Sequence, residues 1–257
     1  MQQVTNYTNE MVALQAITDE HFFNNFKRDR RFIEILEHVS YQQGIQYINY
    51  IQVLTSERLL WSKFMENDNY GNPNKSDFYD HLKYIADLSS YNFSPTTLRY
   101  VCFGLQIFNY IESMNIKELS IIEVGCGYGG QCKILFDICS QFGIKINKYT
   151  LIDLENVSKL QRKYLDKFNL QNIVTLPYND CLDKLDGKYD LFISNYALGE
   201  FTTDVQTFYI DNVLNRCDKY FITWNTFPIN SKLSNYKSVE EFPQTGHKEF
   251  PNVILTN

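Results

Sequence analysis

A glycine-rich stretch, EVGCGYGG at residues 123–130, is the part of the sequence whose residue types and spacing most clearly indicate ligand binding. It follows a short apolar run and precedes an amphipathic segment, so we expect it to form the turn between a buried strand and a helix. Glycines let such a turn tighten and let its backbone approach a ligand. The first N–H groups of the following helix would be free to donate to that ligand.

The charge beside this turn distinguishes between two classes of ligand. Gly125, Gly127 and Gly130 fit the GxGxxG pattern of dinucleotide sites, which place an anionic pyrophosphate on the turn. Glu123, at the end of the expected strand, would put a carboxylate near that anion. S-adenosylmethionine has no phosphate and carries a cationic sulfonium and ammonium, and a carboxylate contact would favour it by about 1–3 kcal/mol. The sequence therefore favours S-adenosylmethionine, with a nucleotide-dependent oxidoreductase as the alternative.

Further polar residues follow the expected strands and suggest how a nucleoside cofactor is held. Asp153 closes the second strand, where a carboxylate can accept from both hydroxyls of a ribose. Asp180 follows the third strand and could accept from the adenine amino group, while the Cys181 N–H donates to the ring. Arg99 offers a bidentate partner for the methionyl carboxylate. The predicted cofactor contacts also include Gly129, Gln131, Leu154 and Asn195.

Methyl transfer to an oxygen would need residues that align the acceptor and take up its proton, which helps by about 10²–10⁴-fold. Glu200, after the fourth strand, is our first candidate for the base, and Asn195 and Tyr196 would line the methyl site. Asn225, after the fifth strand, would touch the acceptor. His81 could reach the site from a lid. The alternatives are a solvated Glu200 at a helix start and a surface His81.

Residues from 119 onward alternate between short apolar runs and amphipathic segments, which predicts an α/β fold of the Rossmann-like type with parallel strands and right-handed crossovers. The expected strands are residues 120–124, 149–153, 173–176, 189–194 and 219–224, with an edge strand at 253–255, and the expected helices are 131–142, 157–168 and 203–214.

The N-terminal part reads as helical to about residue 66, with Gly44 separating two helices. Residues 67–74 have turn chemistry throughout and predict a loop. Ser94 suits an N-cap and Pro95 the first position of the next helix. We therefore divide the chain into a helical N-terminal region or lid (1–90) and a cofactor-binding domain (91–257).

Composition excludes several classes of protein. The 257 residues carry a net charge of −6, which disfavours nucleic acid as a partner. The short basic run at 27–31 is expected to be a solvated helix face. We see no signal peptide or membrane span, so we expect a cytoplasmic protein that does not bind membranes. The six cysteines form no metal-ligand spacing and are expected to be packed thiols. A metal-free mechanism is favoured, with a cation-assisted one as the alternative.

The stretches IIEVGCGYGGQCKIL, YTLIDLENVSKLQRKYL and ISNYALGEF, with SPTTLRY at 94–100 and the closing EEFPQTGHKEFPNVI, resemble a bacterial family of sugar O-methyltransferases within the class I S-adenosylmethionine-dependent methyltransferases. The resemblance covers about residues 68–257. It implies a seven-stranded sheet with a reversed final strand, and O-methylation of a sugar during capsule or other surface-polysaccharide biosynthesis. By position it carries over Glu123, Gly125, Gly127 and Asp153 as cofactor contacts.

The expected partner is a small-molecule acceptor such as a nucleotide-activated sugar. Three alternatives stay open: a methyltransferase-like binding subunit without activity, methylation of a phosphoryl or phosphoramidate oxygen on a nucleotide, and the oxidoreductase. The sequence also leaves open a homodimer.

Overall fold

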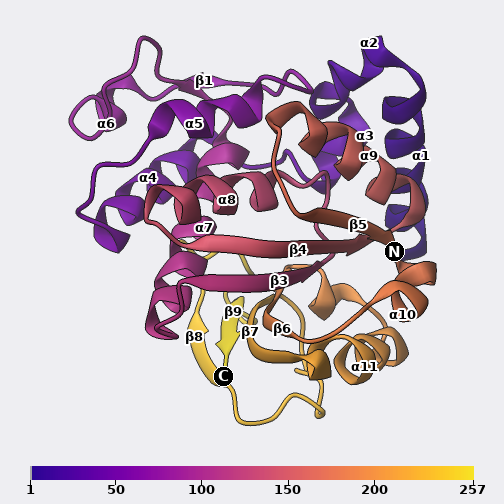
Figure 1. Ribbon diagram of the computed structural model, residues 1–257. Helices are drawn as coiled ribbons and strands as arrows, with labels where there is room; N and C mark the ends of the chain where they lie inside the picture. The colour runs from indigo at the N-terminus through magenta and orange to yellow at the C-terminus, as the bar shows by residue number, and fades with distance from the viewer. Residues whose placement is uncertain (1) are drawn as a thin grey trace.

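A seven-stranded sheet with helices on both faces forms the centre of the protein (Figure 1). The computed structural model describes residues 2–257, and side chains from residue 7 onward. The strands are β3 (Glu118–Val124), β4 (Lys145–Asp153), β5 (Ile173–Pro177), β6 (Tyr189–Asn195), β7 (Cys217–Trp224), β8 (Lys237–Glu240) and β9 (Val253–Thr256). Their order is β5-β4-β3-β6-β7-β9-β8, and β9 is antiparallel to both of its neighbours. The α/β Rossmann-like prediction, with seven strands and a reversed final one, is confirmed.

The two strands nearest the C-terminus differ from the sequence expectation. Residues 253–255 were expected at the edge of the sheet, but β9 lies between β7 and β8. The edge strand is β8, which the sequence did not reveal. All four of its residues are exposed, so the strand lacks the apolar alternation that marks a half-buried strand.

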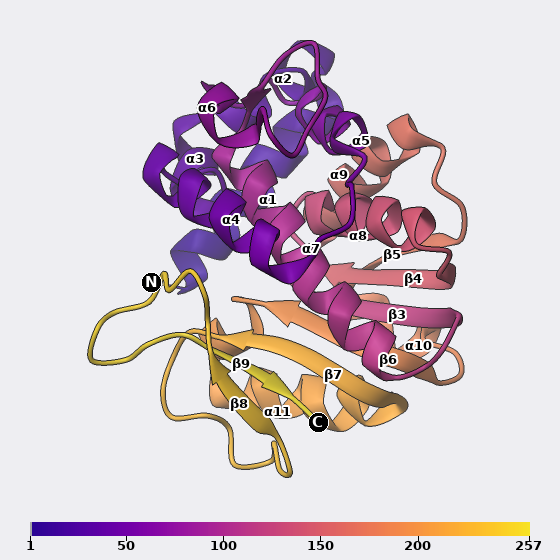
Figure 2. The ribbon, with the colours of Figure 1, turned by 90° about the vertical axis from the view of Figure 1, so that its left-hand side faces the viewer.

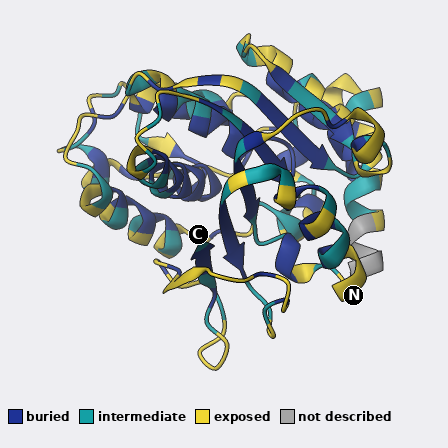
Figure 3. Ribbon diagram, turned by 60° about the horizontal axis from the view of Figure 1, so that its bottom comes forward, coloured by how far each residue is buried: buried dark blue, intermediate teal, exposed yellow. Residues whose placement is uncertain are grey.

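Helices on the two faces of the sheet bury two separate hydrophobic cores (Figures 1 and 2). One face carries α7 (Pro95–Ser113), α8 (Gly130–Gln141) and α9 (Glu155–Leu165), and the other carries α10 (Cys181–Lys184) and α11 (Thr203–Asn212). Adjacent residues of β3 face opposite sides, with Ile121 in the first core and Ile122 in the second. Burial of both faces explains why the strands read as continuous apolar runs, and Figure 3 shows the sheet as buried.

The predicted helices of this half are present with small shifts at their ends. The helix expected at 157–168 ends at Leu165 and continues as a 3₁₀ turn. Ser94 caps α7 as expected, with its hydroxyl accepting from the Thr96 N–H at 3.2 Å. The 3₁₀ turns are η1 (Phe26–Arg28), η2 (Glu66–Asp68), η3 (Asp166–Phe168), η4 (Tyr178–Asp180), η5 (Leu198–Glu200) and η6 (Leu214–Arg216).

The N-terminal helices pack against the first face rather than standing apart from it. They are α1 (Gln2–Thr18), α2 (Glu20–Phe23), α3 (Arg30–Ile35), α4 (Tyr41–Leu54), α5 (Trp61–Met65) and α6 (Tyr79–Leu82), and a small hairpin pairs β1 (Ser76–Asp77) with β2 (Asn92–Phe93). Helix α1 lies along α9 and α4 lies along α7. One continuous core therefore joins residues of both predicted regions.

Gly44 does not separate two helices, contrary to the sequence prediction, because it lies inside α4. The boundary is at Ser40, whose hydroxyl accepts from the Gln43 N–H while the Gln43 side chain accepts from the Ser40 N–H. Gly44 is needed for packing, since a Cβ there would come within 2.7 Å of the Phe78 ring.

The basic run at 27–31 is not a uniformly solvated face, because Lys27 is fully buried. Its ammonium donates to the Asn67 carbonyl at 2.7 Å and lies 4.2 Å from the centre of the Tyr128 ring. Burial lowers the pKa of Lys27 to about 8. This cation–π contact holds the tyrosine of the glycine-rich turn.

The predicted loop at 67–74 follows the short η2 turn and has a buried start. Asp68 accepts from the Ser94 N–H at 2.7 Å and from the Thr97 hydroxyl at 2.6 Å, so the loop fixes the first turn of α7. The six cysteines are free thiols, five of them buried. No helix among the described residues is long and apolar enough to cross a membrane.

Candidate functional site

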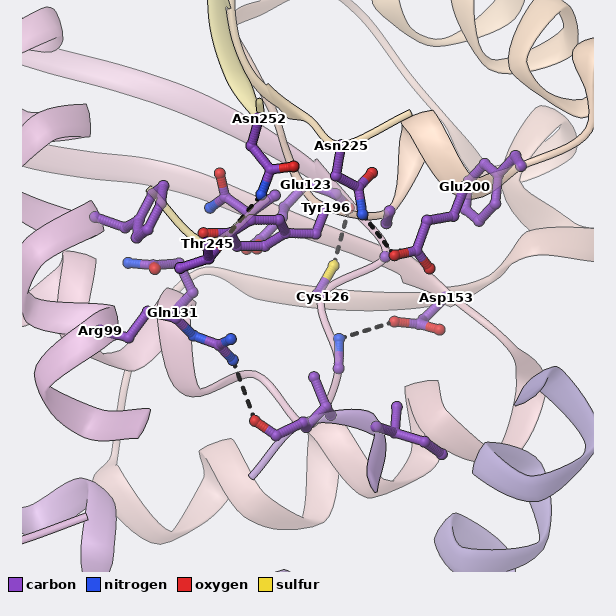
Figure 4. Close-up of a pocket in the computed structure, with 18 of the residues that line it drawn as sticks. Arg99, Glu123, Cys126, Gln131, Asp153, Tyr196, Glu200, Asn225, Thr245 and Asn252 are labelled. Carbon is purple, nitrogen blue, oxygen red and sulfur yellow. Dashed lines mark hydrogen bonds between the residues drawn. The ribbon is translucent and has the colours of Figure 1, made fainter. Parts of the chain in front are cut away.

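A cavity of about 820 Å³ opens where β3 and β6 end, the point at which the order of the parallel strands reverses. Ligands of open α/β sheets bind at this position, and the volume is typical of a small-molecule site. The wall is formed by the glycine-rich turn, by the ends of β4, β6 and β7, by α7, and by two segments distant in sequence, residues 35–47 and 245–252 (Figure 4).

The glycine-rich turn has a backbone that only glycine adopts easily at its key positions. Gly125 and Gly127 have φ values of +74° and +53°. A Cβ at Gly125 would come within 2.1 Å of the Ala197 Cβ, and one at Gly127 within 2.9 Å of the Leu36 side chain. The turn is thus closely approached by the end of β6 on one side and by the N-terminal region on the other.

Three glycine N–H groups of this turn, those of Gly125, Gly127 and Gly129, already have protein acceptors. Gly127 donates to Asp153 Oδ2 at 3.1 Å. Gly125 donates to the backbone carbonyl at the end of β4, and Gly129 to a carbonyl within the turn itself. The carboxylate of Asp153 therefore lies directly against the turn, where a ribose-binding carboxylate is expected.

Two carboxylates flank the turn, one buried (Glu123) and one half-buried (Asp153). Glu123 is 2% exposed and accepts from the Tyr149 hydroxyl at 2.7 Å. Asp153 accepts from the Leu154 N–H at 2.8 Å. Burial raises the pKa of each carboxyl to about 7, and for Glu123 the neighbouring Asp153 adds to the rise. Among the described residues, no lysine, arginine or histidine forms an ion pair with either.

Arg99, in the first turns of α7, is a cation that, like the two carboxylates, has no partner of opposite charge. The guanidinium donates to the Leu36 carbonyl at 3.1 Å and lies 5.6 Å and 5.7 Å from the ring centres of Tyr100 and Tyr196. It is 9% exposed, and no carboxylate in the described part of the chain pairs with it. A buried guanidinium with one hydrogen bond retains donors for an anionic ligand.

Polar side chains gather where β6 and β7 end (Figure 4). The Asn225 amide donates to Glu200 Oε1 at 2.6 Å, and partial burial raises the pKa of Glu200. Asn195 Oδ1 accepts from the Thr223 hydroxyl at 2.9 Å, while Asn195 Nδ2 and Asn225 Oδ1 are buried without a protein partner. Buried amide atoms without partners are costly, so they indicate a ligand that completes them.

Residues 241–252, which we call the C-terminal arm, close the cavity from the side of the sheet edge. Glu241 is 1% exposed and accepts from the Tyr196 hydroxyl, from the Thr245 N–H at 3.0 Å and from Asn252 Nδ2 at 2.9 Å. Tyr196 has a φ of +63°, which is unusual for a residue with a bulky side chain. The arm and the end of β6 are therefore tied together through one buried carboxylate.

Most of the predicted site residues meet in this cavity, and four do not. Those lining it are Arg99, Glu123, Gly125, Gly127, Gln131, Asp153, Leu154, Asn195, Tyr196, Glu200 and Asn225. Asp180 instead pairs with Lys184 at 2.6 Å on the outer side of α10. Cys181 is buried in the second core, and Gly129 packs against Leu165 as the cap of α8. His81 lies in α6 and does not line the cavity.

The sequence reasoning missed the residues that reach the cavity only through tertiary packing. His38 and His247 line it in place of His81, and Tyr178 lines it where Asp180 was expected. Burial, with Arg99 nearby, lowers the pKa of His38. No local pattern marks these positions. Within the described part of the chain, no group of three histidine, cysteine, aspartate or glutamate residues is placed to bind a metal ion.

Comparison with known proteins gives similarity only to solved structures. No family model matches the chain, and no curated protein matches it. Magnesium protoporphyrin IX methyltransferase (ChlM) from Synechocystis PCC 6803, solved with bound SAM, is 13% identical, with 82% of this chain and 95% of that chain covered and a TM-score of 0.45. TrmK from M. capricolum, solved with SAH, is 16% identical, with 58% and 66% covered and a TM-score of 0.40.

A SAM-dependent methyltransferase from Aquifex aeolicus is 13% identical, with 58% of this chain and 88% of that chain covered and a TM-score of 0.38. Because these TM-scores are below 0.5, the similarities do not establish an activity, which depends on the residues of the site.

Proposed function

We propose that the protein is an S-adenosylmethionine-dependent methyltransferase that binds its cofactor at the glycine-rich turn. One observation carries the proposal: the turn is flanked by the buried carboxylate of Glu123 and the half-buried carboxylate of Asp153, and neither has a cationic partner among the described residues. The N–H groups of Gly125, Gly127 and Gly129 already donate within the protein. Such a site disfavours a pyrophosphate and favours a positively charged nucleoside. It therefore argues against the oxidoreductase alternative.

The residues present fit the parts of this cofactor. Asp153 would hold the ribose hydroxyls, Glu123 would face the cationic amino acid end, and Arg99 would pair with the methionyl carboxylate. Tyr178, beside the end of β5, offers an aromatic face for the adenine. When bound, the cofactor supplies a methyl group on sulfonium, which is already activated toward an oxygen nucleophile.

We further propose that the acceptor is a hydroxyl group of a sugar, in line with the sequence resemblance to enzymes of surface-polysaccharide biosynthesis. Glu200 would accept the proton of the hydroxyl as its oxygen attacks the methyl carbon, and Asn225 keeps the Glu200 carboxylate in place. Arg99 is the one arginine or lysine among the described residues that line the cavity. With Arg99 assigned to the cofactor, the acceptor half lacks a fixed cation, which favours a neutral hydroxyl over a phosphoryl or phosphoramidate oxygen.

Two measurements test the proposal. Calorimetric titration should give binding of S-adenosylhomocysteine and none of NADH. The reverse result would establish the dinucleotide alternative. Incubation with methyl-labelled S-adenosylmethionine and UDP-glucose, UDP-N-acetylglucosamine or GDP-mannose should then transfer label to a sugar hydroxyl. Label on a phosphoryl group would contradict the sugar assignment, and cofactor binding without any transfer would indicate an inactive binding subunit.

A further inference from the structure

Two exposed aromatic rings stand together at the cavity mouth. Phe250 of the C-terminal arm lines the cavity and is 59% exposed. Phe227, in the loop after β7, is 45% exposed, and the two ring centres lie 6.2 Å apart with 39° between their planes. Large apolar side chains are rarely left open to water in pairs, and at the edge of a cavity they indicate a bound partner.

Hydrogen-bonding groups surround this aromatic pair. Thr245, His247 and Asn252 of the arm line the same cavity. His247 Nδ1 accepts from the Glu249 N–H at 3.3 Å, which leaves the Nε2–H of a neutral ring free to donate to a ligand. Asn225, beside Asn252 at the ends of the paired strands β7 and β9, has its Oδ1 buried without a partner. An apolar face with donors and acceptors at its margin matches a sugar ring, which has C–H groups on its faces and hydroxyls around its rim.

A buried carboxylate lies at the centre of the hydrogen bonds that hold the arm. The Thr245 hydroxyl donates to Glu241 Oε2 at 2.8 Å, in addition to the bonds from Tyr196, the Thr245 N–H and Asn252. No lysine or arginine in the described residues forms an ion pair with Glu241. The Gln244 side chain adds bonds to the backbone of Asn252 at 2.9 Å and 3.0 Å, but only Glu241, of the residues that the structure describes, connects the arm by a hydrogen bond to Tyr196 and so to the end of β6.

We propose that Phe227 and Phe250 form a stacking platform for the sugar ring of the acceptor, and that Glu241 is the positioning residue that holds the C-terminal arm over the cavity. This inference rests on the proposed function and assigns acceptor recognition to the arm. The proposed ribose contact at Asp153 lies against the glycine-rich turn, whereas the two rings lie in the loop after β7 and in the arm, so cofactor affinity and acceptor KM should respond separately to substitution of the rings.

The first test replaces the platform rings one at a time. Phe250→Ala and Phe227→Ala should each raise the apparent KM for the acceptor by about fivefold to tenfold. The dissociation constant for S-adenosylhomocysteine should stay unchanged. Both rings are exposed, so loss of folding is not expected. Phe242→Ala is the matched control, because Phe242 belongs to the same arm and is 54% exposed but contacts Tyr50 instead of lining the cavity. It should change the KM by less than about twofold.

The acceptor probes are the three nucleotide-sugars named above and a small-molecule extract of the source cells. Each probe is tested over a series of dilutions in the presence of labelled S-adenosylmethionine. Equal effects of Phe242→Ala and Phe250→Ala would overturn the platform, and so would unchanged kinetics in both platform variants. Inhibition by uridine or guanosine monophosphate but not by methyl glycosides would also overturn it, because the rings would then stack on a base. A wild-type protein that binds S-adenosylhomocysteine but labels none of these probes overturns the inference, whereas one that does not bind S-adenosylhomocysteine refutes the proposed function itself.

The second test addresses Glu241. Glu241→Gln places an amide where the Thr245 and Asn252 donors need an acceptor, so the arm should loosen. Trypsin should then cut after the exposed Lys248 faster than in wild type, and the apparent KM for the acceptor should rise more than kcat falls. Glu240→Gln is the control, because Glu240 is the exposed neighbour on β8. If Glu241→Gln does not fold, Thr245→Val removes a single donor instead. If the Glu241 or Thr245 variant that folds shows the same trypsin cleavage and the same kinetics as wild type, Glu241 is not a positioning residue.

Discussion

Replacement of Asp153 by asparagine is the sharpest test of the cofactor site. Asp153 sits at the end of β4 and already accepts from the Gly127 and Leu154 N–H groups at 3.1 Å and 2.8 Å. Gln161 Nε2 also donates to Asp153 Oδ2, at 3.3 Å, so about one of the four lone-pair sites of the ionised carboxylate is left for a ribose hydroxyl. Asparagine keeps one acceptor oxygen and presents an NH₂ donor in place of the other. Losing one hydrogen bond to a charged group costs about 1.5–3 kcal/mol. We therefore expect Asp153→Asn to weaken binding of S-adenosylhomocysteine by about 10–150-fold.

Calorimetry at pH 8 is the suitable assay, because the pKa of about 7 leaves Asp153 mostly ionised there. Asp180→Asn is the matched control, since it makes the same chemical change at a residue that pairs with Lys184 outside the cavity. Its affinity should stay within about twofold of wild type. A wild-type affinity in Asp153→Asn would remove the ribose contact, and an equal loss in Asp180→Asn would mean that the third strand contributes to the site after all.

Three further results are expected. The carboxyls of Glu123 and Asp153 have pKa values of about 7 in the free protein, and a cationic ligand favours their ionised forms, so affinity for S-adenosylmethionine should rise from pH 5.5 to about 7.5 and then level off. Calorimetry in buffers of different ionisation enthalpy should detect proton release on binding below pH 7. An affinity that does not change with pH would contradict the ionised pair. Arg99→Lys, which loses bidentate geometry, should weaken S-adenosylhomocysteine at least about tenfold but leave adenosine binding unchanged, and an equal loss for adenosine would argue against pairing with the methionyl carboxylate. Glu200→Gln should lower kcat about 10²-fold or more without changing cofactor affinity, and an unchanged kcat would exclude Glu200 as the base.

The parts of the fold that the sequence predicted are those with local signals. The glycine-rich turn, the strands ending at Val124 and Asp153, and the Ser94 cap each depend on residues close together in the chain. Arg99 was chosen for its bidentate geometry; it lines the cavity, and its pairing with the methionyl carboxylate stays a prediction.

The parts that were missed depend on contacts between distant segments. Asp180 and His81 have suitable side chains, but the local backbone turns Asp180 toward Lys184 and α6 lies away from the cavity. Glu241 stands beside an exposed glutamate in the sequence, and only the fold shows that its carboxylate is buried under Tyr196. The burial of Lys27 likewise depends on aromatic rings more than a hundred residues further along the chain.

The cavity wall also bears on how such a protein could be re-engineered. Residues 35–47 and the C-terminal arm both line the cavity, and just beyond the first segment Tyr50 of α4 packs against the Phe242 ring of the arm, with 4.6 Å between ring centres. The seam therefore joins segments from opposite ends of the chain. A chimaera that exchanged only one of the two segments would lose the fit between them. Transfer of an acceptor preference to another protein would therefore have to move both segments together.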